Sequence, residues 1–252
     1  MYSKIITALI VLMLSGASAF AQMNSNNCFP EYQNDKLDCN GFKTSKQIVI
    51  PQFPKCTVTV NITLNVCTDA ATGKVSYFVH VESYDFADGD GCKELMNRIN
   101  PNGNSFDEEF SKWFIKQCYY QTVLKVFKEM VESHPGEKYL CPNGITEFSG
   151  FMGSCNAWAV FSIPNRQCPN CPCCNITRFQ LIDCTGSSCC IQKTKICWDK
   201  NGGPVITSDT QTAAPTQCTT ANPEPVPGAI AYGKCFPLCT NEYPYNSDPP
   251  TK

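Results

Sequence analysis

Charged residues and histidine are scarce in this chain of 252 residues. Asp, Glu, Lys and Arg make up only 17% of it, and its 20 basic and 22 acidic residues leave a net charge of −2. This excludes a typical nucleic-acid-binding surface, which needs clustered Lys and Arg to neutralise phosphates. The two histidines, His80 and His134, leave little choice for an imidazole general base.

Long apolar runs are absent beyond residue 21. Before it, Lys4 precedes the apolar segment Ile5–Leu14, and small residues lead to Ala21, a pattern typical of a secretory signal peptide. We therefore expect residues 1–21 to be cleaved. The mature chain is expected to have no transmembrane segment, because about 20 apolar residues are needed to span a bilayer. The expected location is extracellular, at the cell surface or in the periplasm.

The short motifs of several enzyme classes are missing as well. The patterns G-x-S-x-G, H-E-x-x-H, G-x-G-x-x-G and the Walker loop do not occur. His134 precedes Pro135 and Gly136 and is explained as a helix end. His80 falls on the polar face of an expected strand, near Glu82. It is either half of a catalytic dyad or a hydrogen-bonded surface histidine.

Cysteine, by contrast, is abundant, with 19 residues. In an exported chain this abundance indicates a disulfide framework. Cys168 and Cys171 have the C-x-x-C spacing of a zinc site, but export and the number of cysteines favour disulfides. Because the number is odd, at least one cysteine has no disulfide partner within the chain. It is either a buried thiol or a bridge to a second chain, which would make a homo-oligomer.

Distances along strands and turns predict some of the disulfides. Cys184 and Cys189 flank a short turn and are near enough to pair. In the C-terminal part of the chain, Cys235 and Cys239 are expected to pair across a turn. Cys218 is expected to tether this part to the rest of the protein.

Alternation of apolar and polar residues predicts a β-hairpin over residues 56–86. Apolar residues recur at every second position in 58–66 and again in 75–81, which gives each strand one buried face. Matching the buried faces places Val66 opposite Val75 and Ile62 opposite Val79, with the register defined modulo two residues. Two more hairpins are expected, one pairing 145–151 with 156–163 and the other pairing 175–184 with 189–198.

A long helix is expected over residues 105–133. Ser105 and Glu108 have the spacing of a capping box at its start. A stripe of large apolar residues, interrupted at Gln117, marks its buried face; its members are Phe106, Phe110, Trp113, Tyr120, Leu124, Phe127 and Val131. Cys118 lies on the flank of this stripe, where it could bond the helix to the sheet.

The order of these elements predicts an α+β fold, a disulfide-rich antiparallel β-sheet with one long packed helix. Nine of the 18 prolines fall in the last 53 residues, which predicts an irregular Pro-rich C-terminal arm pinned by disulfides. The expected organisation is a signal peptide at 1–21, a disulfide-rich α+β domain at 22–198 and the arm at 199–252.

The most acidic segment contains Asp85, Asp88 and Asp90, separated by Phe, Ala and Gly residues. Calcium prefers several oxygen ligands on a flexible loop, so these three residues are candidate calcium ligands. The segment departs from the EF-hand pattern, because Phe86 and Asn97 stand where acidic residues would be needed. The alternative is a strand-to-helix turn capped by Asp90. No other cofactor is expected.

These observations favour a secreted, disulfide-stabilised, non-enzymatic protein of a surface, matrix or adhesin-like kind, with a protein or glycan surface as its partner. The alternatives are a secreted hydrolase that uses carboxylates or His80, and a module that binds calcium or a small ligand at 85–90. A pocket that gathers His80, Glu82 and a Ser, Cys or Asp would favour the hydrolase. An exposed strand edge or apolar patch would favour the binding protein.

Overall fold

The computed structural model describes residues 37–87, 90–101, 103, 105–164, 175–184, 189–200, 202–213, 218, 223, 225–239 and 242–251. The predicted signal peptide and the C-x-x-C pair at 168 and 171 lie outside these residues. The strands are β1 (Leu37–Val49), β2 (Thr57–Asp69), β3 (Val75–Ala87), β4 (Thr146–Gly153), β5 (Cys155–Pro164), β6 (Asn175–Asp183), β7 (Cys189–Asp199), β8 (Gly203–Ala213), β9 (Ala231–Tyr232) and β10 (Phe236–Pro237). The helices are α2 (Asp90–Ile99), α3 (Glu108–Ser133) and the short 3₁₀-helix η2 (Glu137–Tyr139).

The described strands form one sheet, which divides in two along β3. One edge of β3 pairs with β2 along nearly its whole length. The other edge pairs in parallel with β4 at Tyr77–Val79 and antiparallel with β6 at Tyr84–Ala87. Glu82 forms a bulge in β3 between these two segments, where the register with β2 shifts. A bulge bends a strand and increases its twist. We call residues 80–83 the fork.

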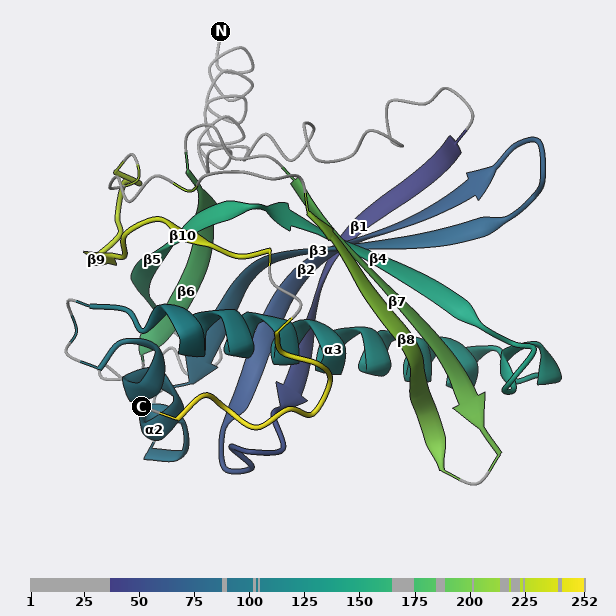
Figure 1. Ribbon diagram of the computed structural model, residues 1–252, viewed down its shortest axis with the longest axis horizontal. Coiled ribbons are helices and arrows are strands. Elements are labelled where there is room, and N and C mark those ends of the chain that lie inside the picture. The colour runs from purple at the N-terminus through teal and green to yellow at the C-terminus, as the bar shows by residue number, and fades with distance from the viewer. Residues whose placement is uncertain are drawn as a thin grey trace, which may run out of the picture.

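The long helix α3 lies along one face of the sheet, here called the helix face (Figure 1). The main core lies between α3 and this face, and Trp158 contacts Tyr84 and Phe179 there with ring centroids 5.7 and 5.8 Å apart. Residues 242–251, here called the strap, cross α3 on its other side (Figure 1). α3 is therefore buried on both sides. Within the described residues, no helix is both long and apolar enough to span a membrane.

The predicted fold class is confirmed, an α+β fold with a disulfide-rich sheet and one long packed helix. Most strand pairs are antiparallel, but β3 and β4 are parallel, so the sheet is mixed. Phe110 and Leu124 are buried, as the stripe predicted. The capping box was wrong, because Asp107 caps α3 and accepts a hydrogen bond from the Phe110 amide. Gln117 does not interrupt the buried face, since it is itself fully buried and bonds to the strap.

The predicted β2–β3 hairpin is confirmed, but its register is shifted by two residues. Val66 lies opposite Tyr77, and Ile62 lies opposite Val81. The turn contains the four residues 70–73, and the Asp69 side chain closes it by accepting hydrogen bonds from two main-chain amides. A shift of two residues leaves the side chains of 75–81, which precede the bulge, on their predicted faces. Alternation alone therefore predicted the buried face but not the pairing.

The other two predicted hairpins were wrong. β4 pairs with β3 and β7, whereas β5 pairs with β6, β9 and β10. Only Ser154 separates β4 from β5, so the chain crosses the fork instead of turning back. β6 and β7 likewise lie on different sides of the fork. Part of the predicted arm is regular, because Gly203–Ala213 forms strand β8 and pairs with β7.

Six disulfides join described cysteines, and all of them bridge separate elements or segments. They are Cys39–Cys67, Cys56–Cys92, Cys141–Cys197, Cys155–Cys218, Cys184–Cys235 and Cys190–Cys239. Cys189 is disulfide-bonded as well. The predicted tether from Cys218 to the main domain is confirmed, whereas the pairs 184–189 and 235–239 were wrong. All three cysteines of the arm bond to the domain, because the arm packs on it and has no core of its own.

The bond between Cys118 and the sheet that the sequence suggested is absent. Cys118 is the one free thiol of the described residues, and it is completely buried. Burial raises the pKa of this thiol well above its usual value, which keeps it protonated and unreactive. Cys118 therefore fits the buried-thiol alternative, and it is not accessible to bridge two chains.

Candidate functional site

The acidic residues and the histidine that the sequence singled out are near the fork. Asp85 of β3 is 8% exposed. Arg178 of β6 binds both of its oxygens, with Nε–Oδ1 at 2.6 Å and Nη2–Oδ2 at 2.7 Å. Asn61 of β2 donates to the same carboxylate and to Ser83, both at 2.9 Å. Such a two-pronged, charged hydrogen bond is strong and directional, so Asp85 holds three strands together.

Glu82, the bulged residue, links β3 to two further strands. Its carboxylate accepts a hydrogen bond from Thr63 of β2 at 2.6 Å and forms an ion pair with Lys43 of β1 at 2.8 Å. Burial alone would raise the pKa of Glu82, but the bonds from Lys43 and Thr63 outweigh it and lower this pKa. The carboxylate is therefore stabilised in its charged form at the point where β3 changes partner.

His80 sits between the two halves of the sheet. Its Nδ1 lies 3.3 Å from the main-chain oxygen of Phe151 in β4. Two carboxylates, Glu82 and Asp183, interact electrostatically with the ring. Loss of water around Asp183 raises its pKa, and the interaction with His80 opposes this. His80 therefore interacts electrostatically with two acids, and a main-chain contact orients its ring.

The calcium prediction for Asp85, Asp88 and Asp90 stays a prediction. Asp85 already binds Arg178 and Asn61, Asp88 lies outside the described residues, and Asp90 is the first residue of α2. The strand-to-helix turn is present, because β3 ends at 87 and α2 begins at 90. Gly91 has a packing role, since a Cβ there would lie 2.3 Å from the Lys55 carbonyl oxygen. Calcium binding would be tested by a calcium-dependent rise in melting temperature that Asp90→Asn reduces.

Three cysteine sulfurs gather within 4.8 Å of one another at Cys155, Cys184 and Cys235. A metal would need thiolates as ligands. The sulfur of Cys155 is instead bonded to Cys218, and the sulfurs of Cys184 and Cys235 are bonded to each other. The cluster is therefore a pair of adjacent cross-links that fastens the C-terminal arm to β5 and β6.

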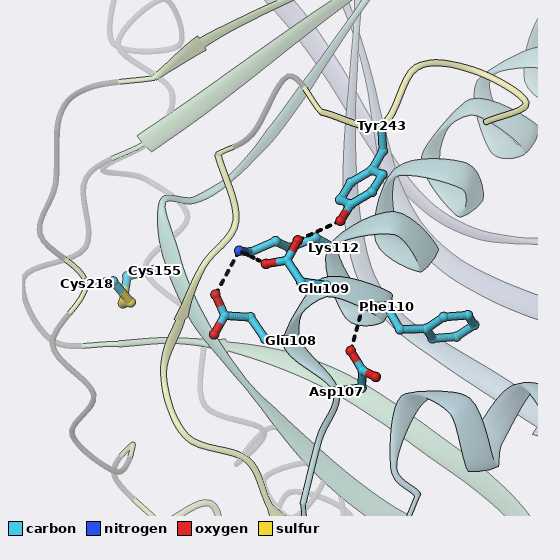
Figure 2. Close-up of polar contacts among 8 residues, drawn as sticks. All are labelled: Asp107, Glu108, Glu109, Phe110, Lys112, Cys155, Cys218 and Tyr243. Carbon is cyan, nitrogen blue, oxygen red and sulfur yellow. Dashed lines mark hydrogen bonds and ion pairs between the residues drawn. A yellow bond between two sulfur atoms is a disulfide. The ribbon is translucent and has the colours of Figure 1, made fainter. Parts of the chain in front are cut away.

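Polar contacts fasten the strap to the first turns of α3 (Figure 2). Lys112 is 7% exposed and pairs with Glu108 at 2.7 Å and Glu109 at 2.8 Å. The hydroxyl of Tyr243 in the strap donates to Glu109 at 2.6 Å. Burial lowers the pKa of Lys112, but the bonds to the two acids outweigh it and raise this pKa. This cluster ties the strap to the helix.

Side chains of the helices also bind the main chain of the strap. Trp113 donates to the carbonyl oxygen of Ser247 at 2.9 Å, and Gln117 donates to that of Pro244 at 2.9 Å. Arg98 of α2 donates to the carbonyl oxygen of Pro250 at 2.8 Å. The side-chain oxygen of Gln117 accepts from the Asn246 amide at 3.0 Å. The strap therefore covers α3 through specific bonds, and not only through apolar contact.

The sheet divides at β3 and therefore has three edges, which differ in the strands that cover them. At one edge, β9 and β10 of the arm pair with β5. At the other two, β1 pairs only with β2, and β8 pairs only with β7, among the strands that the structure describes. Near the β1 edge the helix face carries a patch of partly exposed apolar residues, here called the open patch: Phe42, Val66, Val75 and Tyr77. Phe42 is 51% exposed and Val75 is 44% exposed.

Sequence reasoning missed β1 altogether. Its helix-face positions 42, 44, 46 and 48 carry Phe, Thr, Lys and Ile, so only two of the four are apolar. An edge strand that extends past the helix needs no continuous apolar face, and its alternation is correspondingly weak. The pair Ile48 and Val49 before Pro51 was the remaining signal.

The chain was compared with models of protein families, with curated proteins and with solved structures, and none of the three comparisons gave a match.

Proposed function

We propose that this protein is an extracellular, non-enzymatic binding or structural protein that makes contact through the open edge of β1 and the open patch. Its disulfides support an oxidising location, and they hold the sheet in a fixed shape. The observation that carries the proposal is the contrast between the edge at β5 and the edge at β1. The arm pairs with β5, while β1 is an edge strand of 13 residues on which Phe42 is 51% exposed.

The role of the fork also favours a non-enzymatic function. Asp85 and Glu82 bind Arg178, Asn61, Lys43 and Thr63, so they join the strands of the sheet. A catalytic acid or base needs a proton that it can exchange with a substrate. The bonds that Glu82 accepts instead favour its charged form, and both oxygens of Asp85 are occupied by Arg178 and Asn61.

The hydrolase alternative rests on a single observation, the electrostatic interaction of Glu82 and Asp183 with His80. It predicts turnover of a model ester, glycoside or peptide substrate that His80→Ala abolishes. The binding proposal predicts no His80-dependent turnover of these substrates. Any activity that disappears with His80 while the melting temperature stays unchanged would contradict it.

The open patch is tested with bis-ANS, a dye whose fluorescence rises on exposed apolar surface. Phe42→Ser should lower the fluorescence of the full chain several-fold, because it removes the largest exposed side chain of the patch. Val205→Ser is the matched control, since Val205 is 43% exposed on β8, away from the patch. Equal fluorescence of the wild type and Phe42→Ser would show that the patch is not a contact surface.

A further inference from the structure

The direction of the free main-chain groups on β1 follows from a disulfide. Cys39 lies directly opposite Cys67, with the two Cα atoms 4.0 Å apart. In antiparallel sheets, opposite residues that do not hydrogen-bond to each other are about 4.5 Å apart, and those that do are about 5.5 Å apart. The amide and carbonyl of Cys39 therefore point away from β2. By alternation, those of Gly41, Lys43 and Ser45 point outward as well.

A contact from α3 supports the same alternation and sets its limit. Lys125 donates a hydrogen bond to the carbonyl oxygen of Gln47 at 2.8 Å. Gln47 is an even number of residues from Cys39, so its carbonyl faces outward too. Beside it, Lys46 is ion-paired with Glu129 of α3. The helix thus occupies the edge near Gln47, and no other described strand pairs with the outward groups of 39–45.

We propose that this edge pairs with the same edge of a second copy of the chain. The two β1 strands would run antiparallel across a two-fold axis, with Phe42 opposite Phe42 of the second copy. The inference rests on the proposed function and names its partner. Because the same segment serves both copies, the contact closes on itself as a dimer and does not propagate. Cys118, the one free thiol of the described residues, is buried and takes no part in this contact.

Charge and geometry select this register. Outward residues must face each other, so Gly41 pairs with Lys43 of the second copy and Cys39 with Ser45. On the helix face, Asp38 then lies opposite Lys46 of the second copy, near Lys125. The two Phe42 rings meet at the axis, and aromatic pairs across strands are favourable. Asp38 of each copy is therefore brought beside Lys46 and Lys125 of the other, where Lys46 is also paired with Glu129 of its own helix.

The neighbouring registers are poorer. A shift in one direction places Lys43 opposite Lys43 of the second copy, and like charges directly opposite each other are unfavourable. A shift in the other direction places Gly41 opposite itself and Asp38 opposite Thr44, which loses the ion pair. Only the register centred on Phe42 combines an aromatic pair with opposite charges.

Cysteine cross-linking of the full chain tests this arrangement. Phe42→Cys places two thiols opposite each other at the axis, in a pair whose geometry suits a disulfide, so it should form a reducible dimer. Val49→Cys is the matched control, because Val49 is 43% exposed on the same strand but lies beyond the paired segment. Mass spectrometry should identify the 42–42 link. Equal cross-linking of both variants, or none with Phe42→Cys, would overturn the proposal.

A second variant tests the strand pairing itself. Lys43→Pro removes an outward amide while leaving the ladder between β1 and β2 intact, since proline is tolerated where the missing amide faces solvent. It should abolish the concentration-dependent dimer in sedimentation, whereas Lys43→Ala should retain it. A wild type that is monomeric at every concentration would contradict the dimer. If Phe42→Ser nevertheless lowers bis-ANS fluorescence, the proposed contact surface survives and only the second copy as partner is wrong.

Discussion

The edge at β5 and the edge at β1 show two ways of ending the same sheet. At β5, the arm adds β9 and β10, and two disulfides fasten it to β5 and β6. At β1, a single disulfide joins the strand to its neighbour, and among the described strands none covers the outer side. Cross-links at β5 hold the covering strands in place, while the cross-link at β1 stiffens an edge that no other described strand covers. A rigid open edge is suited to recognition, because pairing costs it little conformational freedom.

The largest difference between the two regions is expected in their cores. Trp158 of β5 is fully buried and donates a hydrogen bond to Ser111 at 2.9 Å. Trp158→Ala should therefore lower the free energy of unfolding by about 3–5 kcal/mol. Phe42→Ala should change it by less than about 1 kcal/mol, because the side chain is half exposed. Denaturant unfolding with intact disulfides measures both, and similar losses would remove the distinction.

The next largest effect on stability is expected from removing a disulfide in either region. Replacing both cysteines of the 184–235 bond or of the 39–67 bond with Ala should cost about 2–4 kcal/mol in either case. The position of local opening should differ. Loss of the bond at 39 should make residues 37–49 sensitive to limited proteolysis, and loss of the bond at 184 should expose the arm. Cleavage at the same sites in both variants would contradict two independent regions.

Next to the fork, the ion pair between Asp85 and Arg178 joins β3 to β6, and its loss should matter less than a change in the core. Arg178 is 30% exposed, so Arg178→Met should cost about 1–3 kcal/mol, below the usual cost of breaking a fully buried pair. Asp85→Asn should have a similar effect. The double variant should lose less than the sum of the two, because the residues bind each other. Additive losses would show that the bond carries no coupling energy.

The smallest effect on stability is expected from lowering the pH, through the charge of Glu82. The lowered pKa of Glu82 means that this residue contributes stability above the unfolded pKa of a glutamate, about 4.3. That contribution is lost as the pH falls through the lower pKa of the folded state. The melting temperatures of the wild type and Glu82→Gln should therefore differ at about pH 6, which is above the unfolded pKa, and converge at about pH 3, which is below it. A constant difference across this range would mean that Glu82 acts without its charge.

Local elements could be predicted from the sequence because their signals are local. The alternation in 58–66 reflects one buried strand face, and the spacing from Phe110 to Phe127 reflects one helix face. The choice of strand partner is not local: residues 146–164 look like a hairpin, yet they cross the fork at Ser154. The same limit applied to the cysteines, whose disulfides span 28 to 63 residues.

The candidate site was only partly accessible for the same reason. Asp85 and His80 could be picked out as ionisable residues, but the partner of Asp85 is Arg178, 93 residues away. No spacing rule connects them. The open edge escaped sequence reasoning because its function requires free main-chain groups, and every residue type has those. Phe42, the one aromatic residue of β1, became meaningful only once the strand was placed.

Amide hydrogen exchange at two protein concentrations tests the central claim most directly. We predict that the amides of Gly41, Lys43 and Ser45 exchange rapidly in dilute protein and become protected in concentrated protein, while β5 is protected equally in both. Fast exchange of these three amides at every concentration, or new protection on β8 instead of β1, would contradict the account.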